Sequence, residues 1–207
     1  MKKNILILFL IFFNVVTSQN YKITFLRSSN GNLIENQDAI WVFTNTSQTL
    51  ISSEKIMNNK SEFPFEQTFI NRSNDFFQQI TNLNEREIIS TKDSTSVKKQ
   101  TFEFLSETKK ILGYHCKKVK TIINSNTIEL WYTEDLKVKG APTILGQNLG
   151  LVLEMVRNGN FVVAATKVEK IKTFPEVSLP KKNVDVLTYK DLVWKNRFTT
   201  IEVFKEQ

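Results

Sequence analysis

The sequence contains only one histidine and one cysteine, His115 and Cys116, and they are neighbours in the chain. On a β-strand successive side chains point to opposite faces, so these two could not easily meet at one site. A cysteine nucleophile needs a base within hydrogen-bond distance, and no second histidine can supply it. A zinc site would need two carboxylates from distant parts of the chain. The scarcity of these residue types therefore argues against nucleophilic catalysis and against a metal site.

Other signatures of enzymes are also missing. The sequence has no glycine-rich phosphate loop, no serine nucleophile elbow and no series of zinc ligands. Among the acidic residues, Glu129 and Glu154 are the candidates for paired carboxylates, because both lie on predicted strands. A solvated strand face accounts for them more simply. We therefore predict no catalytic residue, no cofactor and no enzymatic activity.

Long apolar runs are limited to one, from Ile5 to Val16. Two lysines precede it and small residues follow at Val16-Thr17-Ser18, so residues 1–18 resemble a secretory signal peptide. The run is shorter than the roughly 20 residues of a membrane-spanning helix. No cysteine follows for lipidation. We predict an exported mature chain from near Gln19, without a transmembrane helix, in the periplasm, at the outer membrane or secreted.

The formal net charge is +7, carried mainly by lysines that are scattered along the chain. Such spacing is typical of solvated strand edges and turns, where lysines also discourage edge pairing. Nucleic-acid binding would need a tighter basic footprint with interleaved aromatic residues. We predict no nucleic-acid partner, whereas weak attraction to an anionic membrane or glycan surface remains open.

β-Strand patterns dominate residues 19–207, which we predict to form a single domain. Strands are expected in the first half at Tyr21–Leu26, Ala39–Thr44, Glu85–Thr91 and Thr101–Leu105. Between them, residues 45–84 are rich in Asn, Ser, Gln and Thr, and we interpret them as a loop-rich excursion with one or two short strands.

The centre of the chain carries the clearest hairpin signals. Ile111–Ile123 and Thr127–Thr133 flank a turn at Asn124-Ser125-Asn126. Leu149–Val156 and Phe161–Val168 flank the Asn158-Gly159 pair, which tolerates positive φ. These four runs predict an antiparallel meander with apolar residues on both faces, and hence a curved or covered, half-barrel-like sheet.

The C-terminal part is predicted to cover that sheet. Thr188 and Asp191 resemble a capping box, and a helix is expected from about Tyr189 to Arg197 that would fill the concave face. A last strand is expected at Thr199–Phe204. The predicted fold is therefore a mainly β, curved antiparallel sheet with a short C-terminal helix.

Three residues of the meander are the candidates for ligand or partner contact. Trp131 and Phe161 could line a concave apolar surface, and Glu129 shares the predicted face of Trp131. Core packing of the aromatic rings and solvation of Glu129 are the alternatives. Cys116 is interpreted as a buried small apolar residue. Asp93-Ser94-Thr95 is similar to an O-glycosylation acceptor at Ser94, or is a polar turn.

A series of short motifs also runs through the central region. They contain Gly113, Tyr114 and Cys116 in Ile111–Lys118, then Trp131 before Tyr132-Thr133, then Gly140, and finally Gly150 and Leu151 in Leu149–Glu154. Their order resembles the GLPGLI family of exported Bacteroidetes proteins, although Gln147–Val152 departs from the motif that names it. The resemblance implies an exported protein of largely unknown biochemistry that supports outer-membrane systems such as TonB-dependent receptors.

Together these observations favour a non-enzymatic accessory protein of the periplasm or outer membrane, with an outer-membrane protein as its partner. The alternative is a carrier that binds a lipid or another hydrophobic ligand inside the curved sheet.

Overall fold

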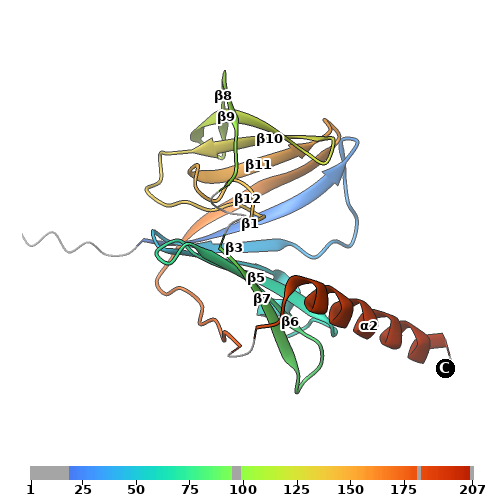
Figure 1. Cartoon of the computed structure of the whole chain (residues 1–207). Helices are drawn as coiled ribbons and strands as arrows, with labels where there is room; N and C mark the ends of the chain where they lie inside the picture. Colours follow the sequence, from blue (N-terminus) through green and yellow to red (C-terminus); the bar gives the residue numbers. More distant parts are fainter. Residues whose placement is uncertain (1–18, 95–98, 181–182, 206–207) are drawn as a thin grey trace, which may run out of the picture.

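The computed structural model of the protein describes residues 19–94, 99–180 and 183–205. Its strands form one open, antiparallel sheet (Figure 1). The first six strands are β1 (Asn20–Ser29), β2 (Asn32–Leu33), β3 (Ile40–Thr44), β4 (Gln48–Ser53), β5 (Phe65–Asn71) and β6 (Phe76–Asn82). The next six are β7 (Ile88–Asp93), β8 (Glu103–Ile111), β9 (Tyr114–Ile123), β10 (Asn126–Thr133), β11 (Leu151–Arg157) and β12 (Phe161–Ile171). The helices are α1 (Glu54–Met57) and α2 (Val186–Lys205).

The first strand, β1, lies in the middle of the sheet. The strand order is β7-β6-β5-β4-β3-β1-β12-β11-β10-β9-β8, and β2 pairs with β1 outside this path. From β1 the chain runs outward to β7 at one edge, and from β8 at the other edge it returns to β12 beside β1. The two halves of the sheet diverge from the boundary between β1 and β3, which gives the sheet its bend (Figure 1). The prediction of a curved, mainly β sheet with a C-terminal helix is confirmed.

Tight turns with positive φ at both central residues connect several strands. They occur at Asn30-Gly31, Leu112-Gly113, Asn124-Ser125 and Asn158-Gly159. Such turns match the right-handed twist of the flanking strands. The hairpins at Asn124 and Asn158 are confirmed, but the single run predicted from Ile111 to Ile123 is wrong, because the turn at Leu112-Gly113 divides it between β8 and β9.

Residues 45–84 are more regular than the sequence predicted. They contain β4, β5 and β6, with the short helix α1 after β4, and all three strands belong to the main sheet. The main core lies around the central strands, where Ile23, Phe25, Val42 and Leu153 are buried together. A second cluster forms where the segment between β10 and β11 folds over Leu130 and Val152.

The prediction that the C-terminal helix covers the meander is wrong: helix α2 packs on the β7 half of the sheet (Figure 1), where Tyr189 and Val193 contact Leu83 and Ile89. The capping box predicted at Thr188 is wrong: Asp185 caps the helix, because its Oδ1 accepts hydrogen bonds from the backbone amides of Leu187 and Thr188, both at 3.0 Å. The strand predicted at Thr199–Phe204 is also wrong, since α2 continues to Lys205. Neither helix of the described chain has the length and apolar character that crossing a membrane requires.

Candidate functional site

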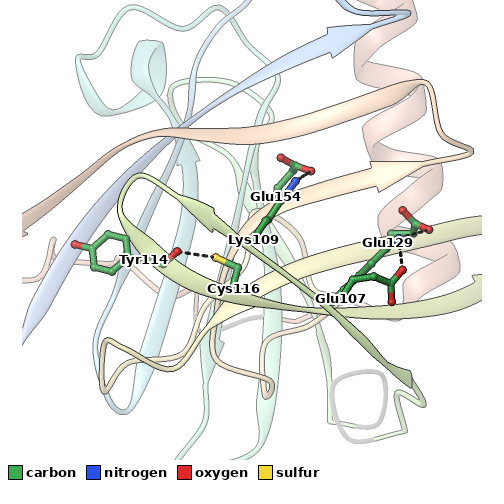
Figure 2. A network of polar contacts seen from close by, with 7 residues as sticks. Glu107, Lys109, Tyr114, Cys116, Glu129 and Glu154 are labelled. Atoms are coloured by element: carbon green, nitrogen blue, oxygen red, sulfur yellow. Dashed lines mark hydrogen bonds and ion pairs between the residues drawn. The ribbon is translucent and has the colours of Figure 1, made fainter.

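Trp131 lies at the centre of a group of charged side chains on strands β8 to β11. We call this group the Trp131 cluster; it consists of Trp131 and Glu129 on β10, Lys118 on β9, Glu107 and Lys109 on β8, and Glu154 on β11. Strand register brings it together, because Trp131 pairs with Lys118 on one side and with Glu154 on the other. Figure 2 shows charged side chains of the cluster in two groups, with Lys109 beside Glu154 and Glu107 near Glu129.

Ion pairs join the members of the Trp131 cluster. Lys109 Nζ lies 2.6 Å from Glu154 Oε1. Lys118 Nζ lies 3.0 Å from Glu129 Oε1 and 3.5 Å from Glu107 Oε1. The side chains of Lys118 and Glu154 are only 14% and 19% exposed, so these pairs are screened less than ordinary surface pairs. Hydrogen bonding to Glu129 raises the pKa of Lys118 above its ordinary value, which keeps this ammonium group charged.

Both lysines of the cluster also approach the indole ring. Lys109 Nζ lies 4.3 Å from the ring centroid of Trp131 and Lys118 Nζ lies 5.5 Å from it. Attraction between these cations and the ring face fixes the orientation of the half-buried indole. The cluster therefore presents an oriented aromatic ring beside three carboxylates and two ammonium groups. The indole also packs against the main core, so a ligand would meet its exposed part together with the charged groups around it, which can exchange hydrogen bonds with hydroxyl groups.

The structure brings two of the three predicted contact residues together and leaves the third apart. Glu129 and Trp131 are two residues apart on β10 and share a face. Although both aromatic rings pack against the main core, Phe161 lies at the start of β12, beside Arg157 and outside the Trp131 cluster. There the ring of Phe161 stacks against Arg157, whose guanidinium carbon is 4.8 Å from the ring centroid.

Sequence reasoning missed Glu107, Lys109 and Lys118. The last of these could have been found, because the turn at Asn124-Ser125 sets a register in which Lys118 falls opposite Trp131. Lys109 was missed because its pairing with Cys116 is set by the turn at Leu112-Gly113, which was not predicted from the sequence. Glu107 could not be placed, because an irregularity between Phe104 and Thr108 shifts the register of β8 there.

His115 and Cys116 have separate surroundings. His115 is exposed, and its backbone amide donates to Asp135 Oδ2 at 2.8 Å, which lowers the pKa of that carboxyl group. Cys116 is buried in the main core, and burial raises the pKa of its thiol. Within the described chain, no group of three or more His, Cys, Asp or Glu residues is arranged to hold a metal ion.

The burial of Cys116 predicts slow thiol chemistry in the folded protein. We expect 5,5'-dithiobis(2-nitrobenzoate) at pH 8 to react at least roughly 100-fold more slowly with native protein than with protein in denaturant, because the buried thiol is both shielded and protonated. Absorbance of the released thiolate measures the rate. Equal rates in the two conditions would contradict the burial of this side chain.

A sequence model of one family, described as the N-terminal domain of the N-glycanase peptide, matches residues 23–191. The chain belongs to this N-glycanase domain family. Two solved structures of PNGF-II, in space groups P21 and C2, are similar to it at 52% and 51% sequence identity, with TM-scores of 0.83 and 0.82. Each likeness covers 86% of this chain but only 34% and 33% of the PNGF-II chains, so this chain spans about a third of their length. Comparison with curated proteins gives no match.

Membership of the N-glycanase domain family corrects several predictions. The resemblance to the GLPGLI family is wrong, because the family match and the similar structures both point to N-glycanases. The same findings overturn the non-enzymatic accessory protein, the carrier alternative and the expectation of no enzymatic activity, since the family takes its name from an enzyme.

The residues that suggested the other family have local structural roles in this N-glycanase domain. Gly113 adopts a φ of 87° in the turn before Tyr114. Gly140 packs against Thr44, where a side-chain Cβ would lie 3.1 Å from Thr44 Oγ1. Gly150 lies against the backbone of β10, and Leu151 is fully buried. Tight turns and close backbone contacts of this kind recur in unrelated sheets, so short motifs built on them identify a family poorly.

Proposed function

We propose that this protein takes part in the removal of N-linked glycans and contacts glycoprotein substrates for an N-glycanase. The single observation that carries the proposal is the family match over residues 23–191, supported by the 52% identical structure of PNGF-II. At this identity the chain shares the fold of the matching part of PNGF-II, with a TM-score of 0.83.

The Trp131 cluster supports a role in substrate contact. A glycan offers many hydroxyl groups and the weakly polar faces of its sugar rings. The carboxylates of Glu129 and Glu154 can accept hydrogen bonds from hydroxyl groups, while the indole ring can pack against a sugar face. The glycosylated region of the substrate would therefore contact the Trp131 cluster.

We also propose that the protein acts outside the cytoplasm. This rests on the signal-peptide pattern of residues 1–18, which lie outside the described residues.

The proposal predicts that binding to a glycoprotein depends on its glycan. We expect the intact chain to bind a purified protein with one N-linked glycan at least roughly tenfold more tightly than the same protein without the glycan, as measured by biolayer interferometry. Glu129→Gln keeps the shape of the Trp131 cluster but removes a charge, and should weaken binding several-fold. Phe104→Ala is the matched control, because Phe104 is exposed on β8, which β9 separates from β10, and is not part of the cluster.

Two results would count against the proposal. Equal affinity for the glycosylated and unglycosylated forms would overturn the role in glycoprotein recognition. If binding depended on the glycan but Glu129→Gln and Phe104→Ala affected it equally, the Trp131 cluster would not be the contact surface. Circular dichroism of each variant establishes that the fold is retained.

A further inference from the structure

A second candidate site lies between helix α2 and the sheet, away from the Trp131 cluster. It is a pocket of about 380 Å³. Strands β5, β6 and β7 contribute Glu66, Gln79 and Thr91, and α2 contributes Tyr189, Lys190 and Trp194. In Figure 1 this region is where α2 runs beside β6 and β7. The volume is in the lower part of the range of small-molecule sites, which is about 300–1,000 Å³.

The sheet beneath this pocket is polar, which is unusual where a helix covers a sheet. Gln79 pairs with Thr91 on β7, and Glu66 pairs with Thr81 on β6, so these side chains share the face under α2. A helix normally packs on a sheet through apolar side chains. Here the buried apolar contacts of α2 lie at Tyr189 and Val193. The helix uses this polar floor in part, because the Tyr189 hydroxyl group bonds to Thr81, and two other polar side chains of the floor, Gln79 and Thr91, line the pocket.

A chain of hydroxyl groups holds Glu66 at the pocket. The hydroxyl groups of Tyr189 and Thr81 are hydrogen-bonded to each other inside the protein. Thr81 Oγ1 also lies 3.4 Å from Glu66 Oε1, to which it donates. Tyr189 and Thr81 are both buried, so the carboxylate of Glu66 is positioned from a rigid part of the structure.

The helix supplies an aromatic wall. Trp194 is 64% exposed although it lines the pocket, and Lys190, one turn earlier, lies on the same side of the helix. An exposed indole beside a polar floor offers a flat apolar surface for stacking. Among the described residues of the lining, the charged groups are the carboxylate of Glu66 and the ammonium group of Lys190.

We propose that this pocket binds a neutral carbohydrate unit, an inference that rests on the proposed function in N-glycan removal. A sugar ring has an apolar face that can stack on Trp194 and hydroxyl groups that can donate to Glu66 and accept from Gln79. The lining combines a polar floor with the apolar side chains of Val186 and Val193, and this mixture suits a sugar ring better than a lipid chain. The pocket has room for roughly one or two sugar rings. It is a second contact for the glycan, on the opposite half of the sheet from the Trp131 cluster.

The test is titration of the intact chain with N,N'-diacetylchitobiose and mannotriose, followed by ligand-observed saturation-transfer NMR. We expect at least one oligosaccharide to bind, and Trp194→Ala to weaken that binding roughly tenfold. Glu66→Gln should weaken it several-fold. Leu187→Ala is the matched control, because Leu187 lies on α2, is 79% exposed and does not line the pocket. Trp194 is exposed, so its replacement should leave the fold intact, as amide NMR spectra will show.

Binding that Trp194→Ala weakens and Leu187→Ala leaves unchanged supports the proposal. Absence of oligosaccharide binding overturns it, and so does binding that Trp194→Ala does not change. Binding of inorganic phosphate or dodecanoate at this pocket in place of the sugars would overturn it as well. If the glycoprotein still bound in a glycan-dependent manner in any of these cases, the pocket beside α2 would not be a carbohydrate site, but the proposed function would stand.

Discussion

Replacing Arg72 with methionine is expected to lower the free energy of unfolding by about 2–4 kcal/mol. Arg72 follows β5, and its guanidinium group lies among neutral oxygen atoms contributed by β3, β4 and the turn between them. Nη1 donates to Thr49 Oγ1 at 2.7 Å, and Nη2 donates to Gln48 O at 3.0 Å and Thr44 Oγ1 at 3.2 Å. The carbonyl group of Asn45 is another acceptor of Nη2.

The cost comes from the acceptors that the arginine would leave behind. Thr44 and Thr49 are fully buried, so water cannot readily replace the guanidinium group. No carboxylate pairs with Arg72 in the described part of the chain, and burial lowers the pKa of its guanidinium to about 10. The group is nevertheless protonated at neutral pH. It therefore acts as a charged donor that connects the end of β5 to the turn between β3 and β4.

Urea denaturation measures the effect of Arg72→Met, and the midpoint should fall by roughly 1–2 M. Arg157→Met is the matched control, because Arg157 is exposed and contacts Phe161 through its guanidinium face. We expect the control to lose less than about 1 kcal/mol. Arg72→Lys keeps the charge with fewer donors and should fall between the two. Equal midpoints for Arg72→Met and Arg157→Met would contradict the structural role of this donor.

The strands of the sheet were predictable where the turn residues and the alternation of polar and apolar residues indicate the same hairpin. Asn124-Ser125 and Asn158-Gly159 indicate hairpins because asparagine and glycine tolerate the positive φ of tight turns. The meander of β9 to β12 follows from these turns and from the alternating strands that flank them. Its connection to β1 was not predictable, since the pairing of β1 with β12 joins residues more than a hundred positions apart.

In residues 45–84 we predicted one or two short strands where the structure has β4, β5 and β6, because neither face of that part of the sheet is uniformly apolar or polar. On β6, Phe76 packs toward Phe174 and Val177, while Phe77 packs against Ile70 on the other face. Gln78 is also buried, and its amide nitrogen donates to Ser90 Oγ at 2.9 Å. Because segments of the chain cover both faces, alternation of polar and apolar residues disappears from the sequence.

The candidate site was also only partly predictable from the sequence. Trp131 and Glu129 stood out because they lie on a strand whose alternation is clear, whereas Glu154 meets Trp131 next to a bulge in the β10–β11 register. The pocket between α2 and the sheet combines three strands with a distant helix, and only Trp194 could have indicated it in the sequence. In the helix expected from Tyr189, this residue falls off the apolar stripe, as an exposed indole would.

Replacing Gly150 with alanine is expected to destabilise the fold by about 3 kcal/mol. A Cβ atom at this position would lie 2.5 Å from the carbonyl oxygen of Thr133 and 3.0 Å from a ring carbon of Tyr132. The first contact is with backbone, which cannot move aside as a flexible side chain could. Relief of the clash would require separating β11 from β10 where Leu151 pairs with Thr133.

Gly159→Ala separates this steric effect from the general cost of losing a glycine. Gly159 has a φ of 73°, yet a Cβ there would meet no atom within 4 Å. Its replacement should therefore cost only about 1 kcal/mol, from backbone conformation alone. Thermal and urea unfolding of both variants measures the difference, and loss of the β10–β11 amide protection in hydrogen exchange would locate it for Gly150→Ala. Equal stability of the two variants would contradict our explanation that position 150 needs glycine because it packs closely against β10.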